Sequence, residues 1–390
     1  MRARFASRFK LVFGFRWPLR EIEEVCQKIL TETSSSPVEP PEGDCVLKYE
    51  VLENLAQIEA IASSWDQILE NSACNRAFSC STWFLATCSH NSQITPHVVI
   101  AKRGTSLAGV LPLASRNDNK TVDFPSAISD YNDLVTCAED HAVQSGLLEA
   151  ALSSASSHQL VLSDVRPDSN CVRGAHLLAE SKGIGVVYQP SRNCYYLELA
   201  HEFDRYLATR SRAFRKGLYR IRRQAAAKQL EVRQLTPADI PAAEVAELFL
   251  SLNASRFQAR SGFLSETTQS FVRQAFPSLF IEGRLIVFAL LEGDRPLAID
   301  LCMRGPNSLC TWNGGFLPEA AQLSPGRLLL AAGIEQAIAE HLQEYDMLRG
   351  SHAYKASWAT HSRSIGKLEL NLQGFTRPSL EHETQSAHCM

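Results

Sequence analysis

The chain has 390 residues, of which 45% are hydrophobic and 21% are charged, and its formal net charge is −3. This length fits two domains with tails, and the charge excludes binding to DNA through an overall positive field. The 11 cysteines are scattered, odd in number and form no Cys-x-x-Cys pair. This pattern excludes a zinc ribbon and a secreted disulfide framework, so we expect a reducing, cytoplasmic location and no bound metal.

Tails are predicted at both ends, over residues 1–44 and 376–390. Residues 1–20 are basic and aromatic and hold no acid, and a Pro/Ser-rich linker covers 31–44. No apolar run approaches the roughly 20 residues that span a bilayer, and the apolar stretch near the start is too short for a signal peptide. Three interpretations of 1–20 stay open: a surface helix that contacts anionic lipid, a disordered tail, and an over-extended start codon.

Residues 45–198 are predicted to form the first of two domains. Apolar residues at helical spacing indicate a helix over 54–70, and two apolar runs around a polar turn, 97–101 and 107–114, indicate a hairpin. The later elements are two short strands within 121–136, a helix at 139–155, a strand at 160–165, a helix at 170–182 and a strand over Tyr195–Leu199.

Residues 199–375 are predicted to repeat this order. The elements are a helix at 238–255, strands at 284–291, 296–304 and 308–316, a helix at 324–341, a strand at 345–350, a short helix, and a strand at 367–372. Each half is thus a β-meander followed by helix, strand, helix and strand. This order predicts an α/β (α+β) fold with mixed sheets covered by helices. The alternative is an unrelated pair of α/β domains.

A motif in the second half is similar to a known signature, D-F-L-R-G-x-x-x-Y-K-x-x-W. The matching residues are Asp346, Leu348, Arg349, Gly350, Tyr354, Lys355 and Trp358. The signature belongs to the FemAB-like branch of the GNAT acyltransferases. Over residues 48–375 the chain resembles above all the CelD/BcsL-type acetyltransferases of bacterial cellulose and exopolysaccharide synthesis. Weaker matches are Phe78–Trp83, Gly109–Leu113, Arg210–Arg223 and Ser324–Gly326.

This resemblance implies tandem GNAT-like domains and an acyltransferase. Its co-substrate would be acyl-CoA, in the first instance acetyl-CoA. Its acceptor would be an amine or hydroxyl of a small molecule, such as a sugar, or of a glycan. By the same resemblance, Tyr354 would protonate the leaving thiolate.

The segment Ser324–Arg327 opens a predicted helix and is the expected donor site. Ser324 is a good N-cap, Pro325 fits the first turn, and Gly326 lets a ligand approach the backbone. A helix start attracts phosphate, so we assign Ser324, Gly326 and Arg327 to donor binding. Only the central glycine fits the usual [Arg/Gln]-x-x-Gly-x-[Gly/Ala] loop. The donor therefore stays open between acyl-CoA and an aminoacyl-tRNA.

An arginine-rich helix precedes the second meander, and Arg212, Arg215, Arg222 and Arg223 are its expected anion-binding residues. CoA phosphates, a lipid-linked sugar and RNA are candidate anions. The alternative is a solvated helix face.

Acyl transfer needs a base, an acid and charge stabilisation. Asp346 and His352 are the candidate bases, Tyr354 is the candidate acid, and Lys355 and Arg349 are expected to neutralise charge or grip the substrate. A structural ion-pair network of Asp346, Arg349 and Lys355 is the alternative. Two other functions stay open: an accessory module without a working donor site, and a tRNA-dependent aminoacyl ligase.

Overall fold

A computed structural model of the protein describes residues 46–372 except 117–121, 126–127, 138 and 156–158. The tails predicted at 1–44 and 376–390, and the basic segment 1–20, lie outside these residues. Within the described residues no helix is both long enough and apolar enough to cross a membrane.

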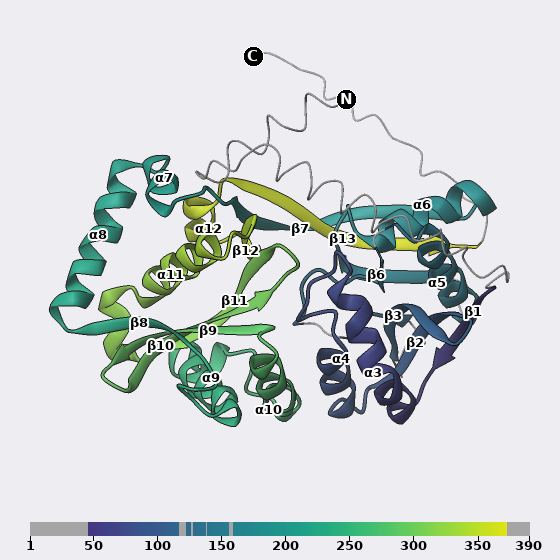
Figure 1. The fold of residues 1–390 in the computed structure, drawn as a ribbon, viewed down its shortest axis with the longest axis horizontal. Helices are drawn as coiled ribbons and strands as arrows, with labels where there is room; N and C mark the ends of the chain where they lie inside the picture. Colours follow the sequence, from purple (N-terminus) through teal and green to yellow (C-terminus); the bar gives the residue numbers. More distant parts are fainter. Residues whose placement is uncertain (1–45, 117–121, 126–127, 138, 156–158, 373–390) are drawn as a thin grey trace, which may run out of the picture. The chain divides into compact units, whose positions relative to one another are not determined.

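The first half is built around a five-stranded antiparallel sheet (Figure 1). Its strands are β1 (Leu47–Leu52), β2 (Ile94–Arg103), β3 (Ser106–Arg116), β4 (Val122–Asp123) and β5 (Val135–Thr136). Apolar side chains alternate along β2 and β3, so each face of the sheet buries its own core. One face packs on α3 (Leu55–Glu70) and α4 (Ser81–Ser89), and the other on α5 (His141–Ser154) and α6 (Asn170–Lys182).

The strands of the second half form an eight-stranded mixed sheet together with β6 and β7 of the first, in the order β6-β13-β7-β12-β11-β10-β9-β8. The bounds are β6 (Gln159–Val165), β7 (Gly185–Glu198), β8 (Leu230–Leu235), β9 (Leu285–Glu292), β10 (Arg295–Arg304), β11 (Ser308–Phe316), β12 (Glu344–Arg349) and β13 (His361–Asn371). Helices α9 (Ala242–Phe257) and α10 (Glu266–Ile281) cover one face. Helices α8 (Arg212–Ala227) and α11 (Pro325–Ala339) cover the other. The short helices are α7 (Phe203–Ala208), α12 (Ala353–Trp358), η1 (Gln258–Arg260) and η2 (Pro318–Leu323).

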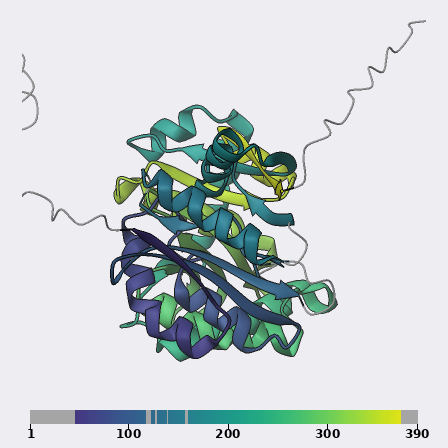
Figure 2. The same ribbon diagram turned by 90° about the vertical axis from the view of Figure 1, so that its right-hand side faces the viewer.

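The last strand within the described residues, β13, connects the two halves. β13 lies between β6 and β7 and pairs with both, as the long strands in Figures 1 and 2 show. Leu368 and Leu370 of β13 are fully buried in the core formed with α5 and α6. The sheet that begins in the second half is therefore completed in the first.

Aromatic side chains form a second junction between the halves. Trp83 of α4 packs edge-on against Phe271 of α10 and Trp312 of β11, with ring centroids 4.8 and 5.8 Å apart. The Trp312 indole N–H donates to the carbonyl of Ile128, at 3.0 Å. Aromatic contacts of this kind stabilise the packing of one element on another.

The predicted fold class is confirmed, because each half has the order meander, helix, strand, helix, strand. Several elements differ from the prediction. Helices α4 and α10 were not predicted; α10 carries Pro277 inside it, a residue that normally argues against a helix. The strands predicted at Tyr195–Leu199 and 367–372 are only the ends of β7 and β13, because polar residues interrupt their apolar pattern.

Candidate functional site

The two parallel strands of the large sheet, β11 and β12, separate after a short paired stretch. Their register joins Ser308–Cys310 to Glu344–Asp346. Beyond it, β11 continues along β10 to Phe316, whereas Arg349 of β12 pairs with β7. The facing strand edges therefore border an opening in the sheet, and ligands gather at such places in α/β folds.

A β-bulge lies on β11 beside this opening. Leu301 pairs with Asn313 and Cys302 with Thr311, so Trp312 is left out of the register. A bulge frees one residue from the ladder and re-aims the neighbouring side chains.

Asp346, one of the two candidate bases, ends the paired stretch and is buried. Its carboxylate accepts hydrogen bonds from the Tyr131 hydroxyl at 2.7 Å and from the Leu348 N–H at 2.6 Å. Arg363 lies 3.7 Å away. Burial raises the pKa of Asp346 above its ordinary value, while Arg363 and the bond from Tyr131 act in the opposite direction. A carboxylate with a raised pKa is a better proton acceptor.

Arg349 connects the two halves through ion pairs. Its guanidinium lies 3.0 Å from Asp130 and 2.7 Å from Asp164, both in the first half. Burial is the main reason that the pKa of Asp130 is raised to about 7, although Arg349 lowers it. These ion pairs join Arg349 to Asp130 and Asp164, whereas the network considered from the sequence was one with Asp346 and Lys355.

Lys355 is buried behind the end of β12. Its ammonium donates to the Arg349 carbonyl at 2.6 Å and to the Leu348 carbonyl at 3.4 Å. Burial lowers the pKa of Lys355, while Asp130 and Asp346 raise it. The lysine supports a bent piece of backbone, because Leu348 and Gly350 both have positive φ, 57° and 119°.

Tyr354 lies on the exposed side of α12, and His352 is the exposed N-cap residue of this helix. Tyr354 is 51% exposed, and its ring stacks on that of His352 at 6.0 Å. Burial and the nearby carboxylate of Asp300 raise the pKa of Tyr354, and Arg256 opposes this effect. Asp300 itself accepts from the Thr311 hydroxyl at 2.8 Å, and burial raises its pKa to about 6.

At the start of α11 the structure corrects one detail. Ser324 has a left-handed backbone, φ 50°, and its side chain makes no capping hydrogen bond. The N-cap bond expected from its residue type is therefore absent, because a cap acts from an extended backbone. A side chain on Gly326 would meet no atom within 4 Å, and the Arg327 guanidinium lies 5.2 Å over the Phe214 ring.

Of the four arginines of α8 that were predicted to bind an anion, two are already engaged. Arg215 donates to carbonyl groups near the end of α7. Arg222 pairs with Glu335 at 2.8 Å. Arg212 and Arg223 are exposed, and no ion pair with any described residue is seen for them. These two remain available to a ligand.

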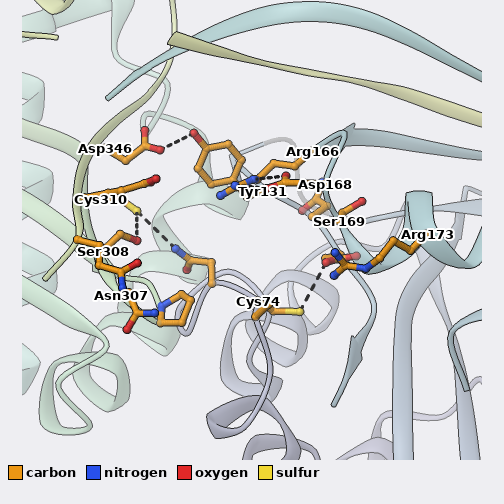
Figure 3. A pocket seen from close by; sticks show the side chains of 17 residues that line it. Cys74, Tyr131, Arg166, Asp168, Ser169, Arg173, Asn307, Ser308, Cys310 and Asp346 are labelled. Atoms are coloured by element: carbon orange, nitrogen blue, oxygen red, sulfur yellow. Dashed lines mark hydrogen bonds and ion pairs between the residues drawn. The ribbon is translucent and has the colours of Figure 1, made fainter. Parts of the chain in front are cut away.

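A cavity of about 210 Å³ lies between the two halves (Figure 3). Tyr131, Arg166 and Arg173 line it from the first half, and Ser308, Cys310 and Asp346 from the second. Tyr131 points across the cavity toward Asp346 in Figure 3, and the Arg166 guanidinium lies 5.2 Å from the Tyr131 ring centre. Asp168 neutralises Arg166 through two hydrogen bonds, at 2.8 and 2.6 Å.

The structure thus gathers Asp346, Arg349 and Lys355 around the end of β12. Tyr354 lies on α12 near Asp300, His352 is the N-cap residue of α12, and Ser324–Arg327 begins α11 close to α8. Sequence reasoning missed Tyr131, Asp130 and the cavity arginines. The polar run 129–133 between two apolar residues could have indicated a buried functional loop, because buried loops need polar side chains to satisfy their backbone groups.

Comparison with known proteins agrees with this architecture. Residues 212–356 match the acetyltransferase (GNAT) domain family. This part of the chain is similar to a GNAT-type acetyltransferase domain. The match runs from the first residue of α8 into α12 and includes the bulge, the start of α11 and all of the motif after β11 except Trp358.

Solved structures resemble nearly the whole described chain. FemX has a TM-score of 0.56 at 12% identity, covering 83% of this chain and 96% of its own. A domain (DUF2156) of an Agrobacterium fabrum protein named as a lysylphosphatidylglycerol synthetase has a TM-score of 0.53 at 12% identity, covering 81% and 92%. L-PGS from Bacillus licheniformis has a TM-score of 0.50 at 10% identity, covering 79% and 90%.

No curated protein sequence matches the chain. At the identities above, the structural likeness shows the fold. The narrower resemblance to CelD/BcsL-type enzymes stays a prediction, and so do the roles of the individual GNAT-domain residues.

Proposed function

We propose that the protein transfers an acyl group, acetyl in the first instance, from acyl-CoA to an amine. The observation that carries this proposal is the opening between β11 and β12, because a different buried carboxylate lies on each side of the sheet there. Asp346 faces the cavity between the halves. Asp300 lies on the α11 side of the sheet, since its same-face neighbours Ala298 and Cys302 belong to the core with α11.

The start of α11 fits the phosphates of the donor. Pro325 has no N–H and the Arg327 N–H donates to the Ser324 carbonyl at 2.9 Å, whereas the Gly326 N–H has no capping side chain from Ser324 and is suited to an anionic ligand. Open space at Gly326 leaves the backbone approachable. Arg327, with Arg212 on the neighbouring α8, supplies positive charge. The donor's extended arm would then lie along the free edges of β11 and β12, where peptide groups offer hydrogen bonds.

Proton transfers are assigned to residues on the two sides of the opening. Asp346 accepts a proton from the acceptor's amine in the cavity, and Tyr354 gives a proton to the leaving thiolate. The backbone at the Trp312 bulge and the buried ammonium of Lys355 stabilise the negative charge that develops between them. Each proton thus moves on its own side of the sheet.

The acceptor we propose is an amino sugar or another small hydroxylated amine. Acids outnumber bases among the titratable side chains that line the cavity, so a cationic amine is favoured over an anion. The resemblance of the Asp346–Trp358 motif to the CelD/BcsL-type enzymes supports a role in exopolysaccharide or cellulose synthesis, with a glycan-type acceptor.

Calorimetry with acetyl-CoA and with CoA tests donor binding. Release of CoA thiol with glucosamine, and with N-acetylglucosamine as the matched control, then tests the acceptor class. Turnover with glucosamine alone supports amine acylation, because the control keeps the hydroxyls and blocks the amine. Absence of CoA binding would overturn the acyl-CoA proposal.

A pair of variants tests the base. Both Asp346 and Asp168 line the cavity, but the pKa of Asp168 is lowered by its bonds to Arg166, against the effect of burial. Asp346→Asn should lose about 10²-fold or more in turnover, while Asp168→Asn should keep most of it. Donor binding by Asp346→Asn would show that the variant is folded.

A second candidate is a tRNA-dependent aminoacyl ligase. The exposed cations of α8, Arg212 and Arg223 among them, form an outward face that suits a polyanion. Binding of charged tRNA in place of CoA would select this candidate.

A further inference from the structure

The loop 128–133 of the first half is held firmly in place. Asn132 donates from its side chain to the Ser163 carbonyl at 3.0 Å. Asp133 accepts from the backbone N–H groups of Asn170 and Cys171, at 2.9 and 2.8 Å, where α6 begins. The end of the loop is thus fixed to β6 and α6, which are rigid elements of the first half.

Three of the preceding residues of this loop contact the second half. Ile128 accepts from Trp312, Asp130 pairs with Arg349, and Tyr131 donates to Asp346. These partners are the bulge residue of β11 and two motif residues of β12. A loop from one half therefore contacts each side of the opening in the other half.

The backbone of Tyr131 has a strained conformation. Its φ is 59°, a left-handed value that residues other than glycine rarely adopt. Such strain persists where the surroundings impose it, and it points to a function for the residue. Here it directs the phenol hydroxyl onto Asp346 at 2.7 Å, with the side chain buried.

We infer that Tyr131 is a positioning residue of the acyl-transfer site, which orients the Asp346 carboxylate and keeps it ionised. The inference rests on the proposed function, in which Asp346 accepts the acceptor's proton. The Leu348 N–H donates to Oδ1 of the carboxylate, and the Tyr131 hydroxyl donates to Oδ2. The bond from Tyr131 thus fixes Oδ2 toward the cavity. The first half thus completes the catalytic site of the second.

Other titratable groups also influence the protonation of Asp346, in addition to Tyr131. The titratable groups that face it or influence it from the surrounding elements are Arg363, Arg166, Lys355, Asp130, Glu344, Cys194 and Cys310. Removing the Tyr131 hydroxyl leaves all of these in place. A hydrogen bond to the charged form favours that form, so its loss raises the pKa of Asp346.

Tyr131→Phe tests the inference, because it removes one oxygen and keeps the ring. Tyr188→Phe is the matched control: its hydroxyl donates to a backbone carbonyl of the first half, that of Val165, at 3.1 Å. The full chain is assayed with acetyl-CoA and glucosamine, CoA thiol release being followed from pH 5 to 9. Tyr131→Phe should lower turnover about 10-fold near neutral pH, and the acidic limb should move up by about one pH unit.

The outcomes separate the two proposals. Tyr188→Phe should keep the wild-type profile. An unmoved acidic limb in Tyr131→Phe, with or without a lower melting temperature, overturns the inference and leaves the proposed function intact. Full turnover in Asp346→Asn, or no transfer by the wild type, overturns both.

Discussion

Asp130 of the first half and Arg349 of the second form an ion pair, 3.0 Å from Oδ1 to Nε, in which the carboxylate is almost completely buried. Arg349 also contacts Asp164 of β6. Because Asp130 is so buried, its protonation is linked to the stability of the junction between the halves.

The stability of the wild type should therefore depend on pH through Asp130. Its pKa is 3.8 ordinarily and about 7 in the folded protein. Between these values the folded state binds more protons than the unfolded state, so the free energy of unfolding falls as the pH rises. Asp130→Asn lacks this titration. Urea denaturation between pH 4 and 8 should show the wild type losing stability relative to Asp130→Asn over this window, and parallel curves would contradict the assignment.

Lys355→Met should remove most of the activity. The substitution keeps much of the apolar stem and deletes the ammonium that binds the Leu348 and Arg349 carbonyls. We expect turnover to fall by about 10²-fold or more. Lys367→Met, at a solvent-exposed pair with Glu369, is the control. A folded Lys355→Met variant that binds donor and turns over normally would make Lys355 purely structural.

Gly326→Val should weaken donor binding without affecting the fold. The glycine has open space around it, so the added side chain blocks a ligand rather than a neighbour. We expect the dissociation constant of CoA to rise about 10-fold or more by calorimetry. Gly262→Val, also at an open position, should bind CoA like the wild type. Equal affinities would move the donor away from α11.

The α8 arginines should divide into two groups. Arg212→Glu with Arg223→Glu should weaken binding of the anionic donor and flatten its salt dependence, with little change in melting temperature. Arg222→Glu should lower the melting temperature, because it places an acid beside Glu335. Unchanged affinity in the first variant would show that this face is merely solvated.

Gly315→Ala should destabilise the protein through close packing. A Cβ at this position would lie 2.2 Å from the Leu252 carbonyl carbon of α9, so backbone must move. We expect a loss of about 2 to 3 kcal/mol in the free energy of unfolding. Gly262→Ala should be close to neutral by the same urea measurement. A stable Gly315→Ala would mean that α9 and β11 are less tightly packed.

Local patterns in the sequence were sufficient to predict the order of most helices and strands. The apolar spacing of 54–70 and 238–255 and the hairpin runs depend on neighbours a few residues apart, and they predicted the mixed α/β fold that the structure has. The motif from Asp346 to Trp358 likewise lies in one stretch of chain. Its resemblance to GNAT enzymes could therefore be read directly, and the acetyltransferase domain match contains all but the motif's last residue, Trp358.

The contacts between the halves were decided only by the tertiary structure. Tyr131 and Asp346 are 215 residues apart in the chain, and no periodicity links two such positions. The insertion of β13 between β6 and β7 depends on backbone pairing, which carries almost no sequence signature in a strand with polar interruptions. The left-handed backbones of Tyr131 and Ser324 are imposed by their surroundings, against the preference of their residue types. For this protein, short-range spacing specified the elements and the motif, whereas long-range packing determined which side chains surround Asp346.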